Sequence, residues 1–164
     1  MPEIDLVPSM FDRLVDPDLA LKATTQGYSV RELEEAVRDD LLDLLNTHRP
    51  PEGTFDGNPD VARSVANYGL RDLAHLESLS SEERAGMALH IKQVIETYEP
   101  RLCDVEVSIR SPEEVESEKG HEHNRAAVYF RITAALNLRP HKVEGISFVT
   151  MLELTNGRHD VFKG

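Results

Sequence analysis

The chain has 164 residues, 40% hydrophobic and 29% charged, a balance that is typical of a globular protein and not of a disordered one. Its 30 acidic and 18 basic side chains give a formal net charge of −12. That charge argues against binding to DNA, RNA or anionic lipid, whose phosphates it would repel. The single cysteine, Cys103, excludes an intrachain disulfide, and no stretch approaches the roughly 20 apolar residues of a membrane span. These features favour a cytoplasmic protein that docks onto basic protein surfaces.

The charge is distributed unevenly along the chain. Residues 1–45 carry 11 acidic and 4 basic side chains, whereas residues 140–164 carry 3 of each. A near-neutral C-terminal segment beside an acidic body indicates a packing surface.

Residues 1–28 are interrupted by prolines, a glycine and several aspartates, so we expect a loosely structured N-terminal segment. Within it, Met10, Phe11 and Leu14 have helical spacing and predict one docking turn. We expect the remainder, 29–164, to be a single domain.

The first long helix is predicted over residues 30–46. Ser29 and Glu32 form a capping-box pattern, in which each side chain bonds the backbone of the other residue. Apolar residues then recur at helical spacing and predict one buried stripe: Val30, Leu33, Val37, Leu41 and Leu44. Pro50 and Pro51 follow the predicted end.

A short helix is predicted to begin at Asn58-Pro59-Asp60 and to run through Val61, Val65 and Tyr68, with Gly69 as its stop. The second long helix is predicted over 81–98, because Ser80 and Glu83 repeat the capping-box spacing. Its predicted buried face consists of Met87, Ala88, Ile91, Val94, Ile95 and Tyr98.

After Pro100 the hydrophobic period changes to two, which is typical of strands. Three strands are predicted, with inward residues Cys103, Val105, Val107 and Ile109 in the first; Val128, Phe130, Ile132, Ala134 and Leu136 in the second (126–136); and Ile146, Phe148, Leu152 and Leu154 in the third (145–155). Asn156-Gly157 predicts a type I′ turn into a short return strand with Val161 and Phe162. The fold class is therefore α+β, with N-terminal helices packed on one face of a small antiparallel sheet that ends in a C-terminal hairpin.

The sequence predicts no catalytic residue, no metal site and no cofactor. It lacks phosphate-binding, nucleophile-elbow and zinc-helix motifs. His121-Glu122-His123 lies in a glutamate-rich loop, 111–125, and is interpreted as solvated, because it lacks the spacing of a zinc site. Cys103, on an apolar face, is interpreted as a buried, inert thiol.

Four segments resemble one known family when they are taken together. They are residues 10–14 (Met-Phe-Asp-Arg-Leu), 41–49 (a leucine-rich helix end closing in Asn-Thr-His-Arg), 64–73 (Ser-Val-Ala-Asn-Tyr-Gly-Leu-Arg-Asp-Leu) and 98–102 (Tyr-Glu-Pro-Arg-Leu). In this order they resemble the blocks of TssE, the type VI secretion baseplate subunit, which is related to the phage baseplate-wedge proteins once called lysozyme-like. Ala66, Arg71 and His48 depart from the family pattern.

The resemblance implies a structural subunit of the baseplate wedge with no enzymatic activity. Its partners would be the wedge subunits TssF, TssG and TssK, the first ring of the TssB/TssC sheath, and the VgrG hub nearby, at a membrane-docked baseplate in the bacterial cytoplasm. Glu99, Pro100 and Arg101 would contact wedge helices of a partner. From the residues alone, Glu99 and Arg101 either pair with each other or reach a partner. The other predicted partner-binding residues are Asn67, Tyr68, Gly69, Phe148, Leu152, Leu154, Asn156 and Gly157.

The predicted hairpin, 146–162, offers unpaired backbone edges, so we expect it to join strands of the sheath. Deleting 156–164 is then expected to leave the monomer folded and to abolish sheath nucleation. Three alternatives stay open: a wedge protein of a phage tail or another contractile injection system, a cell-wall glycosidase with Glu99 or another carboxylate as its acid, and an unrelated acidic adaptor.

Overall fold

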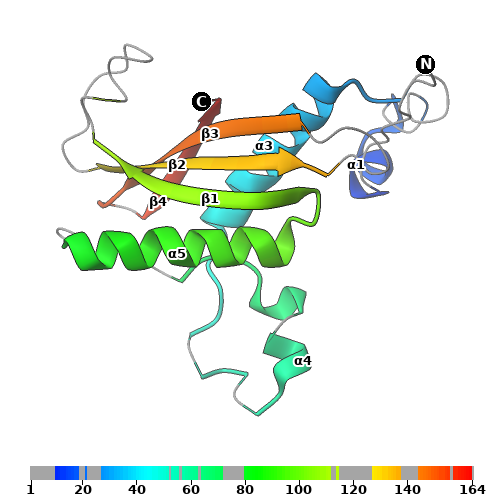
Figure 1. Cartoon of the computed structure of the whole chain (residues 1–164). Helices are drawn as coiled ribbons and strands as arrows, with labels where there is room; N and C mark the ends of the chain where they lie inside the picture. The colour runs from blue at the N-terminus through cyan, green and yellow to red at the C-terminus, as the bar shows by residue number, and fades with distance from the viewer. Residues whose placement is uncertain are drawn as a thin grey trace. The chain divides into compact units, whose positions relative to one another are not determined.

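The computed structural model of the chain describes residues 10–18, 21, 27–51, 53–55, 57–62, 64–71, 80–111, 114, 127–137, 144–155 and 157–163. These residues form helices and a four-stranded antiparallel sheet, which confirms the predicted α+β class (Figure 1). They fall into two compact units, 1–39 and 40–164. His121, Glu122 and His123 lie outside the described residues. The predicted domain boundary after residue 28 stays a prediction.

The first unit contains α1 (Met10–Val15), a single short helix at the position where helical spacing predicted a turn. The Leu14 side chain is 78% exposed and Val15 is 67% exposed. An apolar surface of this kind is compatible with docking to a partner, which stays a prediction.

Helix α3 (Val30–Asn46) has the predicted bounds. The capping box is present, because the Ser29 N–H donates to Glu32 Oε2 at 2.9 Å and the Glu32 N–H donates to Ser29 Oγ at 3.3 Å. Four of the predicted stripe residues are buried, namely Leu33, Val37, Leu41 and Leu44, whereas Val30 at the first turn is only partly buried. Leu45, which the stripe did not include, is also buried. The helix therefore begins and ends where its local chemistry predicts.

The predicted short helix from residue 59 to residue 68 is wrong as one continuous element. The chain forms α4 (Pro59–Ala62) and then a separate 3-10 turn, η1 (Val65–Asn67). Ser64 separates the two: its N–H donates to Val61 O at 3.0 Å, and its Oγ accepts from the Ala66 N–H at 3.2 Å. A serine that bonds its own neighbouring backbone competes with helix continuation.

Helix α5 (Ser81–Tyr98) has the predicted bounds and a complete capping box between Ser80 and Glu83. It runs along β1 (Leu102–Arg110), the strand that directly follows it (Figure 1). Its buried residues are Met87, Ala88, Ile91, Val94 and Ile95. The helix thus covers one face of the sheet with the face that the spacing predicted.

The sheet has the order β1-β2-β3-β4, with β2 (Ala127–Leu136), β3 (Glu144–Glu153) and β4 (Arg158–Lys163). Every neighbouring pair is antiparallel. One face carries the predicted core residues of β2 and β3: Val128, Phe130, Ile132, Ala134, Leu136, Ile146, Phe148 and Leu152. Leu154 lies just beyond β3 and is only partly buried.

Cys103 does not share the inward face with Val105, contrary to the predicted alternation. The pairing register shifts between Cys103 and Glu106, and Asp104 has a φ of 52°. This bulge places Leu102 toward the core, opposite Leu136, and turns Cys103 to the other face. The cysteine is partly buried and its thiol lies 3.3 Å from Ala135 O, so the prediction of a core thiol is wrong.

The opposite face of the sheet also carries a small apolar cluster, which strand periodicity did not predict. Tyr129 and Val149 are buried there, with Ala127 and Met151 packed against them. This part of the sheet therefore has buried apolar side chains on both faces.

The β3–β4 hairpin is present, but its loop is longer than the predicted two-residue turn. Glu153 pairs with Arg158, so residues 154–157 form a four-residue connection. The Gly157 N–H donates to Glu153 O at 2.9 Å, and Gly157 has a φ of 69°, which glycine adopts without strain. Asn156 lies outside the described residues.

Strand β4 carries a buried histidine, which ties the hairpin to the rest of its unit. His159 is 1% exposed, and its Nδ1 lies 3.2 Å from the hydroxyl of Thr150 on β3. Deleting residues 156–164 would remove this buried side chain and all pairing to β3. The structure therefore argues against the expectation that the truncated monomer stays folded.

Burial lowers the pKa of His159 to about 4, from an ordinary value of 6.5. Between these pH values the histidine binds a proton in the unfolded chain but not in the folded chain. The free energy of unfolding therefore falls as the pH falls from 6.5 toward 4. We expect His159 alone to lower the free energy of unfolding by about 3 kcal/mol as the pH falls through this range. Urea denaturation from pH 7 to pH 4 would show a shallower pH dependence for His159→Gln, whereas His48→Gln, at an exposed position, serves as the matched control.

Candidate docking site at the helix–strand junction

The junction between α5 and β1 is a tight turn made by Glu99, Pro100 and Arg101. The Glu99 N–H caps α5 by donating to Ile95 O at 2.8 Å, and the Leu102 N–H donates to Glu99 O at 3.1 Å. Pro100 therefore occupies the second position of a four-residue turn, where its fixed φ is favoured. Its side chain is exposed, so the turn presents a rigid, apolar point at the surface.

Arg101 is bound within the chain by two carboxylates. Its Nε donates to Glu99 Oε1 at 2.7 Å, and its backbone N–H donates to the same oxygen at 3.1 Å. Its Nη2 donates to Glu99 Oε2 and to Asp40 Oδ2. Of the two possibilities left open by the sequence, internal pairing of Glu99 with Arg101 is the one observed.

This cluster is buried at one end and exposed at the other. Glu99 is only 5% exposed, whereas the side chain of Asp40 is 45% exposed. Burial alone would lower the pKa of Arg101, but the hydrogen bonds and charges of Glu99 and then Asp40 outweigh burial and raise it. The guanidinium is therefore held as a fixed cation that braces the turn.

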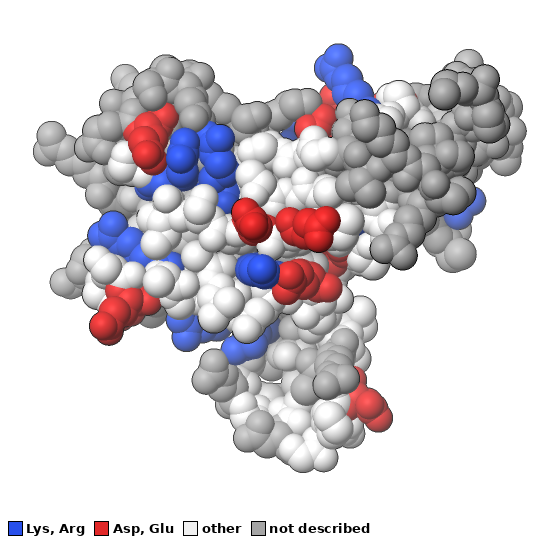
Figure 2. Space-filling model, viewed as in Figure 1, with Lys and Arg blue, Asp and Glu red and all other residues white. Residues whose placement is uncertain are grey.

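Figure 2 shows acidic and basic side chains mixed over β1 and α5, with several acidic ones near the middle of this face. Exposed acidic residues on these two elements include Glu96, Asp104 and Glu106. The net charge of −12 on the whole chain suits a basic partner surface.

The segment 64–70 lies against the end of α5. The rings of Tyr68 and Tyr98 pack edge to face, with centroids 5.3 Å apart, and the Tyr98 hydroxyl donates to Ser64 O at 3.2 Å. Burial raises the pKa of Tyr68, and the charges of Asp40, Asp43 and Glu99 raise it further, with Arg101 opposing them. The predicted residues 67–69 and 99–101 are thus brought into one region of the fold.

The motif segments 41–49 and 64–73 are joined by a short backbone bridge. The Leu70 N–H donates to Thr47 O at 2.8 Å, and the Arg49 N–H donates to Leu70 O at 2.9 Å. Gly69, which directly precedes Leu70, has a φ of 106°, and a Cβ on it would lie 2.1 Å from Thr47 O. Only glycine fits this close approach, so Gly69 has a structural role whatever it contacts.

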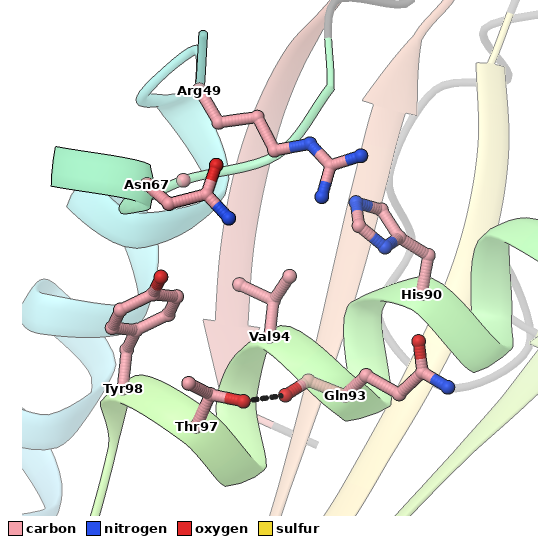
Figure 3. A pocket seen from close by; sticks show the side chains of 8 residues that line it. Arg49, Asn67, His90, Gln93, Val94, Thr97 and Tyr98 are labelled. Atoms are coloured by element: carbon pink, nitrogen blue, oxygen red, sulfur yellow. Dashed lines mark hydrogen bonds between the residues drawn. The ribbon is translucent and has the colours of Figure 1, made fainter. Parts of the chain in front are cut away.

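A pocket of about 170 Å³, lined mostly by residues with polar side chains, lies beside this bridge, where α5 meets the segment 64–70. Figure 3 shows Arg49, Asn67 and His90 around it, with Thr97 and Tyr98 along the helix. The Thr97 hydroxyl donates to Gln93 O at 2.7 Å. Burial raises the pKa of Tyr98, and the positive charge of Arg49 opposes that rise. The pocket holds roughly five to six water volumes, which is smaller than usual ligand sites.

The predicted hairpin residues are placed differently from the junction residues. Phe148 and Leu152 are 1% and 0% exposed, so their side chains belong to the core. Leu154 and Gly157 lie in the hairpin loop. The hairpin therefore presents to solvent chiefly its loop and the outer edge of β4, and its contact with a partner stays a prediction.

Two contacts of the fold were not predicted from the sequence: that of Asp40 with Arg101 and that of Asn46 with His159. Asp40 stands 61 residues from Arg101, and Asn46 stands 113 residues from His159. No local spacing encodes such contacts. Among the described residues, no group of His, Cys, Asp or Glu is arranged to hold a metal ion. No helix in the described part of the chain is long and apolar enough to cross a membrane.

The family described as baseplate wedge protein gp25 matches residues 31–141. The chain belongs to this family. The match includes helix α3 from its second residue, the Gly69 bridge, the braced turn at 99–101 and strands β1 and β2, and it ends before β3. The resemblance to TssE and its phage relatives is thereby confirmed at the level of the baseplate wedge family.

A solved structure entitled "The baseplate complex from the type VI secretion system" contains a chain similar to this one. The two are 15% identical with a TM-score of 0.47, and the similarity covers 74% of this chain and 94% of that chain. None of the curated proteins matches the chain. The family assignment rests on the match over residues 31–141.

Proposed function

We propose that this chain is a non-enzymatic, structural wedge subunit of a type VI secretion baseplate, of the TssE kind. Membership of the baseplate wedge family carries the proposal. The secretion branch is favoured by the sequence of residues 64–70, which resembles the TssE block. The partners proposed are TssF, TssG and TssK on the wedge side and the first TssB/TssC ring on the sheath side.

The surface proposed for wedge contact is the turn at Pro100. The hydrogen bonds of Arg101 to Glu99 and Asp40 hold the backbone of this turn in one conformation. Little conformational entropy is therefore lost when a partner docks on the turn. Because Arg101 is committed to internal bonds, we propose that it positions the turn and that Pro100 supplies the exposed contact. This role differs from the direct contact by Arg101 that the resemblance implies.

The burial of Glu99 supports a structural role over a glycosidase. Both of its carboxylate oxygens accept hydrogen bonds from Arg101, and the residue is nearly inaccessible. A catalytic acid of a glycosidase must reach the leaving-group oxygen of the sugar, with a second carboxylate across the cleft. Glu99 in this position braces the chain through its hydrogen bonds to Arg101.

The surface proposed for sheath contact is the β3–β4 hairpin. Within the described sheet, β4 has a strand neighbour on one side only. An edge strand of this kind accepts an extended segment from another chain through backbone hydrogen bonds. Sheath initiation by strand addition is therefore proposed for β4.

Pro100→Arg should weaken wedge binding without unfolding the chain, because the side chain is exposed and the added bulk meets the partner and not the core. We expect the tagged wild-type chain to co-purify wedge and sheath subunits from cells that make a type VI system. The Pro100→Arg variant should recover about tenfold less of the wedge subunits, which corresponds to about 1.4 kcal/mol. Mass spectrometry of the recovered proteins, with thermal melting of the variant, measures both effects.

Leu89→Arg, at an exposed position on α5, is the matched control, and it should recover the wild-type amounts. Equal recovery by Pro100→Arg would remove the turn from the interface while keeping the family role. If the wild-type chain recovers no wedge or sheath protein from such cells, the proposed function is wrong.

A further inference from the structure

The outer edge of β4 is occupied at one residue by a side chain from α3. The Asn46 Nδ2 donates to His159 O at 2.9 Å, and the His159 N–H donates to Asn46 Oδ1 at 3.0 Å. In an antiparallel sheet, one residue exchanges this pair of hydrogen bonds with the residue opposite it on the next strand. The Asn46 carboxamide therefore takes the place of a strand neighbour at His159.

The carboxamide is fixed in this orientation. Its Nδ2 also donates to Leu42 O at 2.9 Å, in the last turn of α3. Because both carbonyls require a donor and the His159 N–H requires an acceptor, the positions of nitrogen and oxygen are determined by the network. Leu44 and Leu45, both buried, hold the end of α3 in place.

The contact also determines which backbone groups of β4 point outward. The N–H and C=O of His159 point to Asn46, away from β3, although His159 is paired in register with Leu152. Successive residues of a strand direct these groups to alternate sides. Asp160 and Phe162 therefore bond toward β3, and the next outward-pointing N–H and C=O belong to Val161.

We infer that Asn46 closes the β4 edge at His159 and confines strand addition to the backbone from Val161 onward. The partner is an extended backbone segment of another protein. Its identity as a sheath strand rests on the proposed function, but the closed position does not. By removing one pairing position, Asn46 limits the registers in which an added strand can bind, and a one-residue slip would reverse the faces of its side chains.

Amide hydrogen exchange of the full chain, followed by NMR at single residues, tests the closed position. In the wild type, the His159 amide should be protected as well as the Asp160 amide, and the Val161 amide should exchange much faster than either. Asn46→Ala should remove the protection of His159 and leave that of Asp160. Asn137→Ala, at an exposed position just after β2, is the matched control, and the amide of Phe130 in the central strand β2 reports whether each variant stays folded.

Asn46→Asp provides a second variant in case Asn46→Ala unfolds. It keeps an acceptor for the His159 N–H and loses the donor to both carbonyls, so the His159 amide should keep part of its protection. Unchanged protection of His159 in a folded Asn46→Ala chain, or a Val161 amide as protected as Asp160 in the wild type, would overturn the inference.

Exchange in the complex of the full chain with co-purified TssB/TssC tests the strand addition itself. The Val161 amide should become protected, while the His159 amide, already bonded to Asn46, should not change. A complex that leaves the Val161 amide unprotected would overturn strand addition at this edge, but not the sheath role. Failure of any sheath complex to form would overturn the proposed sheath contact, and the isolated chain would still decide whether Asn46 closes the edge.

Discussion

Replacing Gly69 by alanine should destabilise the chain by about 3 kcal/mol, because strain at a positive φ and a steric clash act together. The new Cβ would lie 2.1 Å from Thr47 O, and the φ of 106° is unfavourable for any residue with a side chain. Relief of the clash requires Leu70 to move from Thr47, with which it shares a hydrogen bond of 2.8 Å. Urea denaturation monitored by circular dichroism measures the loss as a lower midpoint.

Gly86→Ala is the matched control, and it should act in the opposite direction. Gly86 lies on the exposed side of α5, and a Cβ there meets nothing within 4 Å. Since alanine favours a helix interior over glycine, stability should rise by about 0.5 to 1 kcal/mol. Equal stability of the two variants would contradict the close approach of Gly69 to Thr47.

Removing Arg101 should also cost about 3 kcal/mol, because Arg101→Ala leaves the carboxylate of Glu99 buried without its cation. The same denaturation experiment measures this loss. Asp40→Asn should cost less than about 1 kcal/mol, since Asp40 is nearly half exposed and its contribution is screened by solvent.

A double variant separates the pairing from the loss of side-chain packing. In Glu99→Gln with Arg101→Ala, no buried charge is left, so the double variant should be more stable than Arg101→Ala alone. If the double variant is instead less stable than Arg101→Ala, the buried charge is not the source of the cost.

The internal role of Arg101 changes how a binding experiment on this residue is interpreted. Loss of wedge binding by Arg101→Ala would follow from a disordered turn as readily as from a lost contact. Pro100→Arg avoids this ambiguity, because Pro100 is exposed and the bracing residues remain. The substitution that tests wedge contact is therefore Pro100→Arg and not Arg101→Ala.

The sequence by itself determined the parts of this protein that depend on near neighbours. Helices α3 and α5 begin at the predicted residues because each capping box joins residues three apart, and both end at the predicted residues shortly before a proline. The inward face of β2 was predicted by the alternation of its apolar residues, all of which are buried. The four motif segments indicated the family, which the match over residues 31–141 confirms.

Only the tertiary structure decided which distant residues meet. The pairing of Arg101 with Asp40 and of Asn46 with His159 depends on how α3 packs in the unit 40–164, since the partners are separated by 61 and 113 residues. The bulge at Asp104 likewise reversed the face of Cys103, because an extra residue in one strand is defined only by its partner strand. Local hydrogen-bond patterns are encoded in spacing along the chain, whereas the braced turn and the closed edge of β4 arise when separate elements pack together.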